Sequence, residues 1–314
     1  MANDRTAKGN PPKAMITERS VDDYLDQLKK ELKGSDPALI QDALSDAEEY
    51  LRSALDSAKK DRPHIEHAET LDAIFNKYGS PQEVAAAYKK IEAHIQPVFA
   101  PASQPDTRPF LTRFFSIIGD ARAWGAFLYM IFTVLTGSLF GLWGLFGSGI
   151  SLFSLILVIG IPITGLFLLS IRGIALIEGR IVEAMLGMRM PRKPVFIRRG
   201  LGPMDKFKSL IKDPYTWKSL LYLVLMFPLG WLYFGLSGFA LAFALSFIFA
   251  PVLELVFRLP LELYGTDTFT PVGMLPVVVL AGILMIILIL HLAKFIGKKH
   301  GRYAKYMLVR KQPD

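Results

Sequence analysis

Long apolar runs separated by short charged stretches fill the second half of the chain. The runs at residues 124–146 and 150–171 each hold more than the roughly 20 apolar residues that cross a bilayer. Only the uncharged Gly147-Ser148-Gly149 separates them. Because glycine and serine favour turns, this pattern predicts a transmembrane hairpin that turns at 147–149.

A second pair of spans follows a charged middle segment. The run 217–257 is about 41 residues long, more than one span needs, and another run extends from about 272 to 295. Pro228 and Pro251 interrupt the long run. We prefer one long, kinked helix to a span followed by a re-entrant piece around 239–251. The pattern therefore predicts four transmembrane helices in two hairpins.

Shorter amphipathic patterns occupy the N-terminal part of the chain. Apolar residues at spacings of three and four, bounded by capping residues, predict helices over about 20–34, 36–55, 63–78 and 81–91. Gly79 is expected to end the third helix in the left-handed conformation. Ser80, Pro81 and Glu83 form a capping box that begins the fourth. Four such helices predict a small, soluble bundle over 18–95.

The remaining segments complete the domain plan. Residues 1–17 are polar and are expected to be disordered, and four prolines make 96–109 an extended linker. The segment 110–121 is predicted to be an amphipathic helix that lies on an anionic membrane surface, because its apolar residues stand against three arginines in and around it. The apolar residues are Phe110, Leu111, Phe114, Phe115 and Ile118, and the arginines are Arg108, Arg113 and Arg122. The fold class is therefore all-α: a cytoplasmic helical bundle, then a membrane domain over 110–314.

The membrane domain contains the same pattern twice, in repeats of about 120–190 and 213–310. The matching residues that open the copies are Trp124, Tyr129, Gly137, Phe140, Gly141 and Leu142 in the first, and Trp217, Tyr222, Gly230, Phe234, Gly235 and Leu236 in the second. Those that close them are Gly179, Arg180, Met185 and Leu186, and Gly301, Arg302, Met307 and Leu308. We interpret the membrane domain as a duplicated module.

Charge divides the chain in the same way and sets its orientation. Residues 1–100 hold 14 Lys and Arg against 18 Asp and Glu, whereas 101–314 hold 22 against 10. The middle segment 172–218 holds 11 Lys and Arg against 4 Asp and Glu, whereas the segment 258–270 holds 1 Lys or Arg against 2 Asp and Glu. By the positive-inside rule the middle segment and both termini face the cytoplasm. The basic residues are expected at anionic lipid headgroups rather than on nucleic acid, because no nucleic-acid-binding module accompanies them.

Catalytic chemistry finds little support in the sequence. The chain has no cysteine, no phosphate-binding loop, no dinucleotide fingerprint and no nucleophile elbow. We expect no enzyme activity and no cofactor or metal. Glu254 and His291 are candidate intramembrane polar sites, because ionisable residues within spans are costly. Each also has a structural explanation, since both lie near the ends of their spans.

The N-terminal bundle resembles the HAAS signalling domain over roughly residues 18–92. The residues that carry the resemblance are Tyr24, Leu25, Leu28, Asp46, Glu48, Glu49, Tyr50, Tyr78, Gly79, Ser80, Pro81, Val84 and Ala85. Helix capping alone explains part of this pattern, and the segment 59–67 departs from the family's glycine-containing turn. The resemblance implies a helical cytoplasmic module found beside bacterial membrane regulators.

The membrane domain resembles, over about 120–310, a sensor domain family seen in actinobacterial two-component sensor proteins. The duplicated Trp-x4-Tyr openings, the Gly-Arg-x4-Met-Leu closures and the segment Asp213-Pro214-Tyr215-Thr216-Trp217-Lys218 carry it. The chain shows no dimerisation-histidine helix and no ATP-binding glycine boxes, so kinase activity is not implied.

Together these patterns predict a regulatory protein of the bacterial cytoplasmic membrane that relays a membrane or envelope signal to an unknown cytoplasmic partner. A small transporter or lipid-handling protein is the alternative, and a homo-oligomer is left open. The candidate relay pairs acidic residues of the second helix with the basic segment 189–212, through Asp42, Asp46, Glu49, Arg198 and Arg199. If the two dock as exposed charges, each pair contributes roughly 0 to 1 kcal/mol. Alternatively both are solvated faces, with the basic segment bound to anionic lipid.

Overall fold

The computed structural model describes residues 20–61, 67–94, 108–156, 160–194, 202–259 and 270–310. All regular secondary structure in these ranges is helical, and they contain no strand. The predicted all-α class is confirmed. The segments 1–17 and 261–269 and most of the linker 96–109 lie outside the described residues, so the predictions made for them stay predictions.

Four helices form the N-terminal bundle, close to the predicted positions. They are α1 (Val21–Glu31), α2 (Pro37–Asp61), α3 (His67–Tyr78) and α4 (Pro81–His94). Their apolar stripes meet in a core that includes Tyr24, Leu28, Leu51, Leu71 and Phe75. The bundle therefore has a core of its own.

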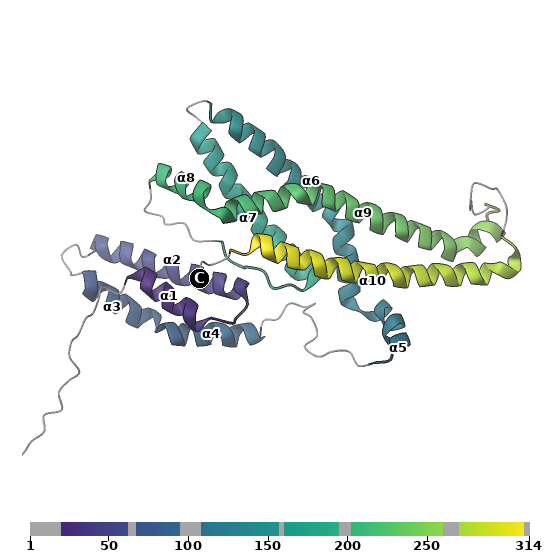
Figure 1. Ribbon diagram of the computed structural model, residues 1–314, viewed down its shortest axis with the longest axis horizontal. Coiled ribbons are helices and arrows are strands. Elements are labelled where there is room, and N and C mark those ends of the chain that lie inside the picture. Colours follow the sequence, from purple (N-terminus) through teal and green to yellow (C-terminus); the bar gives the residue numbers. More distant parts are fainter. Residues whose placement is uncertain are drawn as a thin grey trace, which may run out of the picture.

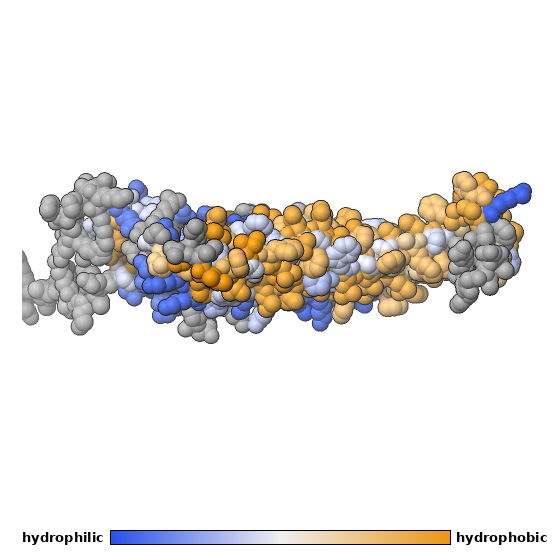
Figure 2. Space-filling model, turned by 90° about the horizontal axis from the view of Figure 1, so that it is seen from above, coloured by the Kyte–Doolittle hydropathy of each residue, from blue (hydrophilic) through white to orange (hydrophobic). Residues whose placement is uncertain are grey.

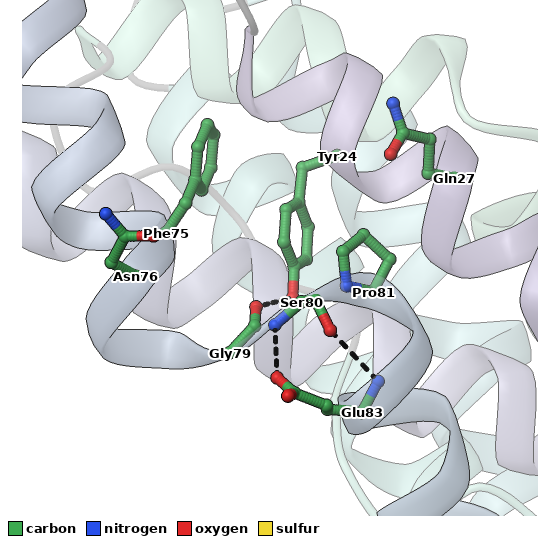
Figure 3. A pocket seen from close by; sticks show the side chains of 8 residues that line it. All are labelled: Tyr24, Gln27, Phe75, Asn76, Gly79, Ser80, Pro81 and Glu83. Carbon is green, nitrogen blue, oxygen red and sulfur yellow. Dashed lines mark hydrogen bonds between the residues drawn. The ribbon is translucent and has the colours of Figure 1, made fainter. Parts of the chain in front are cut away.

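Capping residues set the α3–α4 corner. Gly79 has φ of +106°, a left-handed conformation that glycine adopts without strain. The Ser80 amide donates to Glu83 Oε2 at 2.9 Å and the Glu83 amide donates to Ser80 Oγ at 3.3 Å, the predicted capping box. The Tyr24 hydroxyl donates to the Gly79 carbonyl at 2.8 Å, which ties α1 to this corner (Figure 3).

Four long apolar helices make up the membrane domain. They are α6 (Ala121–Ser154), α7 (Gly160–Leu186), α9 (Pro214–Leu255) and α10 (Leu275–Leu308). Each of the four, with α10 extended by the turn η2 (Val272–Met274), is long and apolar enough to cross a membrane. The short elements α5 (Phe110–Phe115), η1 (Ser116–Gly119) and α8 (Pro203–Lys212) precede the two hairpins. By length and composition the protein is a multi-pass membrane protein.

The long apolar run of the second repeat forms a single helix. α9 contains both Pro228 and Pro251 and continues to Leu255. The structure therefore agrees with the preferred interpretation, one long helix, and the helix has no re-entrant break at 239–251. A membrane helix tolerates proline because neighbouring helices and local adjustments satisfy the freed carbonyl groups.

The predicted turn at Gly147-Ser148-Gly149 is wrong. α6 runs through all three residues to Ser154. A β-carbon at Gly147 would collide with the ring of Phe167 on α7. The glycine therefore permits close packing of the two helices of the hairpin, which is a common use of small residues in membrane helices.

Helices α6 and α9 cross in close contact, and glycines from both repeats make the crossing. A β-carbon at Gly137 would collide with the Met226 carbonyl, and one at Gly230 would collide with the Thr133 carbonyl. Gly137 and Gly230 are equivalent in the two repeats, and so are Thr133 and Met226. The crossing is thus symmetric, with each backbone packed against the other at the same depth in its repeat.

The two hairpins point in different directions from this crossing, and the N-terminal bundle lies beside the ends of α7 and α10 (Figure 1). Figure 2 shows hydrophobic side chains over most of the face made by the long helices, and hydrophilic ones at the bundle end. Large apolar residues are exposed along these helices, among them Leu139, Leu152, Phe239 and Phe249. Such a surface is suited to lipid rather than water.

Candidate functional site

The two intramembrane residues singled out from the sequence are held by local partners. The Glu254 carboxylate accepts from the Thr270 amide at 2.9 Å and from the Thr270 hydroxyl at 2.7 Å. His291 Nε2 lies 3.1 Å from the Phe114 carbonyl oxygen, and its ring stacks on that of Phe114. The two residues share no partner in these contacts. The first contact joins α9 to the residue that comes shortly before η2, and the second joins α10 to α5.

A different polar cluster lies where the repeats meet. The Tyr129 hydroxyl on α6 donates to Glu178 Oε1 on α7 at 3.1 Å and lies 2.8 Å from His300 Nε2 on α10. The Tyr222 hydroxyl on α9 is 3.5 Å from the same Glu178 oxygen and 3.2 Å from His300 Nε2. All four long helices contribute one side chain. We call Tyr129, Glu178, Tyr222 and His300 the quartet.

The quartet follows the repeat symmetry. Tyr129 and Tyr222 each stand five residues after the opening tryptophan of their repeat. Glu178 and His300 each come directly before the Gly-Arg of the closing motif. The duplication therefore places a tyrosine pair across from one acidic and one imidazole group. The residue before the closing Gly-Arg is a glutamate in the first repeat and a histidine in the second, so the two halves of the site differ chemically.

Hydrogen bonds order the quartet and its surroundings. His300 Nδ1 lies 3.2 Å from the Tyr233 hydroxyl. If that hydroxyl donates to Nδ1, Nε2 carries the hydrogen and donates to Tyr129, whose own hydroxyl donates to Glu178. The second carboxylate oxygen of Glu178 and the buried Tyr303 hydroxyl have no hydrogen-bond partner among the described residues. The site can hold a proton on a carboxyl, imidazole or phenol group, and it has a spare acceptor.

Two ion pairs join the repeats across the same region. Asp120, the N-cap of α6, binds Lys294 of α10 at 2.6 Å, and Asp213, the N-cap of α9, binds Arg172 of α7 at 2.7 Å. The two aspartates are repeat equivalents, and so are the two basic residues. Each pair takes its acid from one repeat and its base from the other. Among the described residues, no three His, Asp or Glu side chains are placed to hold a metal ion.

The end of the first repeat contacts α2 of the N-terminal bundle. Arg189, just past α7, binds the Asp42 carboxylate at 2.8 Å and Glu92 at 2.7 Å. The backbone amides of Arg192 and Lys193 donate to the other Asp42 oxygen at 2.8 and 3.0 Å. Asp42 is 5% exposed and Arg189 is 8% exposed, so this contact is buried.

The charges of this contact support one another. Burial raises the pKa of the Asp42 carboxyl, against the opposing effect of its hydrogen bonds with Arg189 and the loop amides. Burial alone would lower the pKa of Arg189, but its hydrogen bonds to Glu92 and Asp42 raise it. The guanidinium group therefore stays charged between two acidic residues of the bundle.

The end of the second repeat contacts the same helix. Lys305 of α10 forms an ion pair with Asp36, the residue before α2. The Arg310 amide donates to the Gln41 side chain at 2.8 Å. Ala38 of α2 packs among buried residues from the long helices. The first turns of α2 are therefore held by the ends of both repeats, and this set of contacts is called the junction below.

Comparison with known families agrees with the two parts of this architecture. Residues 129–308 match the family described as Putative sensor, and residues 23–87 match the HAAS family. The sensor match covers more than half of the chain. The chain belongs to the Putative sensor family. No curated protein and no solved structure matches it.

Both family resemblances are thus confirmed, and the two families together indicate a role in sensing or regulation. HAAS domains are protein-interaction domains. The quartet lies inside the sensor match, because Tyr129 and His300 fall near its two ends. The junction connects the HAAS bundle to both repeats of the sensor domain.

Some of the residues predicted for the relay lie at or beside the junction. Asp42 binds Arg189, and Asp46 forms an ion pair with Lys193 and accepts from the Tyr88 hydroxyl. Glu49 is exposed and adds negative charge near Lys193. Arg198 and Arg199 lie outside the described residues. The expectation of exposed charges is wrong for Asp42, because the loop after α7 folds over it.

Proposed function

We propose that this protein is a sensor and regulator of the bacterial cytoplasmic membrane, with the HAAS bundle and both termini on the cytoplasmic side. The sensor domain responds to a state of the membrane or envelope and changes how firmly the HAAS bundle is docked. The docked and released bundles differ in the surface that they offer to a cytoplasmic regulatory protein. The role requires no catalysis by this chain.

One observation carries this proposal: α2 is held at its beginning by the ends of α7 and α10 together. Asp42 binds the segment after α7, while Asp36 and Gln41 bind the end of α10. Glu178 and His300 of the quartet lie on those same two helices. A change of packing at the quartet could shift α7 relative to α10. Such a shift would move the segment that binds Asp42 relative to the segment that binds Asp36 and Gln41.

The ion pairs of the junction are unequal in energy. Removing one partner of a buried ion pair costs about 3–5 kcal/mol, because the other charge is left without compensation. Exposed pairs such as that of Lys193 with Asp46 contribute roughly 0–1 kcal/mol each and are screened by salt. Among the charged contacts of the junction, loss of Asp42 or Arg189 alone is therefore expected to weaken docking most.

Crosslinking in the cysteine-free chain tests the proposal. Gln41→Cys with Arg310→Cys should be joined by a short bismaleimide crosslinker in membranes, because the Gln41 side chain accepts a hydrogen bond from the Arg310 amide. Adding Asp42→Lys places a second cation beside Arg189, so crosslinking should fall and recovery of the cytoplasmic partner from solubilised membranes should change. Asp72→Lys on α3, the same change of charge away from the junction, is the matched control. If Asp42→Lys leaves both crosslinking and partner recovery at the control level, the proposal is wrong.

A transporter or lipid-handling protein is the second candidate. The observation that favours it is the polar quartet between two membrane repeats, the place where duplicated transporters bind their substrates. The genes next to this one discriminate the two functions. A neighbouring transcription regulator supports the sensor, whereas transport or lipid-synthesis genes support the alternative.

A further inference from the structure

A cleft of about 1100 Å³ opens between the HAAS bundle and the sensor domain, beside the junction, and the junction residues Lys305 and Arg310 form part of its lining. One wall is formed by the end of α1 and the turn that follows it, and the other by the last turns of α10. Six basic residues and one acidic residue line it: Lys29, Lys30, Lys33, Arg302, Lys305 and Arg310, against Asp26.

The charge of the cleft is only partly neutralised. Lys305 is paired with Asp36, and Arg310 lies 3.8 Å from Asp213. The side chains of Lys30, Lys33 and Arg302 are exposed and make no ion pair with any residue in the described ranges. Three cations facing one space attract an anion, and a phosphate group accepts hydrogen bonds from several of them at once.

The floor of the cleft and the helix beyond it are apolar. Ile40, Met188 and Val309 line the cleft beside Tyr306. From Tyr306 and Arg302, one exposed face of α10 continues through Lys299 to Phe295, Leu292 and Leu288, which recur at intervals of three and four residues. The ammonium group of Lys299 lies 5.6 Å from the centre of the Phe295 ring. A basic cleft therefore joins an apolar stripe on a membrane-spanning helix.

The position of Tyr306 fits the headgroup region of a membrane. The ammonium group of Lys218 lies 5.3 Å from the centre of its ring, and Lys218 directly follows the exposed Trp217. Tryptophan, tyrosine and lysine gather at the boundary between lipid tails and water. The cleft therefore lies where a lipid headgroup would lie.

From this juxtaposition we infer that the cleft is a binding site for an anionic phospholipid. The phosphate group binds between Lys30, Lys33 and Arg302, and an acyl chain lies along Phe295, Leu292 and Leu288. A soluble anion would use only the basic half of this surface, and a neutral lipid only the apolar half. Because the headgroup contacts both domains, a bound lipid also stabilises the docked bundle by mass action. The binding site itself does not depend on the proposed relay.

Native mass spectrometry of the delipidated full-length protein in neutral detergent tests this inference. Phosphatidylglycerol should bind more tightly than phosphatidylcholine with the same acyl chains, and glycerol phosphate at equal concentration should not bind detectably. Combining Lys30→Gln, Lys33→Gln and Arg302→Gln should weaken phosphatidylglycerol binding by about tenfold, or about 1.4 kcal/mol. Binding of phosphatidylcholine should not change.

The matched control removes three lysines of α8 outside the cleft, through Lys206→Gln, Lys208→Gln and Lys212→Gln. Circular dichroism and size exclusion confirm folding, and Arg302→Gln alone, at an exposed position, serves if the triple variant does not fold. An equal loss in the α8 control would mean that general surface charge binds the lipid, and the site would be rejected. Binding of glycerol phosphate as tight as that of the lipid would also reject it, in favour of a soluble anion site.

Discussion

Single residues at the quartet show how a duplicated membrane domain can hold polar groups. A carboxyl group away from water is tolerated only when it is hydrogen-bonded. Tyr129 and Tyr222, equivalent in the two repeats, supply hydroxyl groups to one oxygen of Glu178. Duplication alone would give two like groups in the closing motif, and the difference between Glu178 and His300 avoids two facing carboxylates.

The two tyrosines are unequal in their contacts, and this leads to a prediction. Tyr129→Phe removes the hydroxyl at 3.1 Å from Glu178 and 2.8 Å from His300, whereas Tyr222→Phe removes one at 3.5 and 3.2 Å. A buried group left without its partner costs about 1–3 kcal/mol. We expect Tyr129→Phe to lower the melting temperature in detergent clearly more than Tyr222→Phe.

The exposed Tyr306 provides the control for this series, since Tyr306→Phe should change stability by less than about 0.5 kcal/mol. A melting temperature that falls equally for both quartet variants would contradict the geometry. It would mean that the hydroxyl groups of Tyr129 and Tyr222 stabilise Glu178 equally.

At the scale of helices, glycines determine how closely α6 and α9 approach. Gly137→Val or Gly230→Val introduces side-chain atoms where a carbonyl of the partner helix lies. Overpacking of this kind costs about 1–3 kcal/mol or more, because the helices must separate. Each variant should therefore unfold at a lower temperature than the parent protein.

Gly238 on α9 is the matched control, because a β-carbon there meets no atom within 4 Å. Gly238→Val should leave the melting temperature nearly unchanged. If all three valine variants behaved alike, helix propensity rather than the crossing would explain the loss.

Helices were the part of the fold that sequence patterns predicted best. Capping residues such as Ser20, Gly79 and Ser80 act locally, so the bundle helices begin and end near the predicted residues. The prediction of a turn at 147–149 is wrong because a glycine that permits helix packing cannot be told from one that permits a turn by the residues next to it. Which of the two applies depends on Phe167 of the next helix, and a local pattern does not contain that information.

The quartet escaped sequence reasoning for a similar reason. Glu178 and His300 each stand among charged residues, a pattern that is also typical of the polar face of a helix that leaves the membrane. Aligning the two repeats could have found them, since both directly precede the closing Gly-Arg, and the tyrosines are equivalent as well. Their meeting in space depends on the crossing of α6 and α9, which is a tertiary feature.

At the scale of the whole molecule, helix lengths exceed what a bilayer requires. α9 has 42 residues, which at 1.5 Å per residue rise about 63 Å, roughly twice the hydrocarbon thickness. Strong tilt or extension beyond the lipid accommodates such a length. In either case a continuous α9 that crosses the membrane would have its two ends on opposite sides, and its orientation would then depend on charge.

Cysteine labelling in intact cells measures that orientation directly, because the native chain has no cysteine. Ser209 lies on the exposed side of α8 within the basic middle segment, and Thr266 belongs to the weakly charged segment beyond α9, outside the described residues. The basic segment is expected inside by the positive-inside rule. An impermeant maleimide should therefore label Thr266→Cys in intact cells and Ser209→Cys only after permeabilisation. The reverse pattern would place the HAAS bundle outside the cell, where no cytoplasmic partner could reach it, and labelling of both positions would mean that α9 does not cross the membrane.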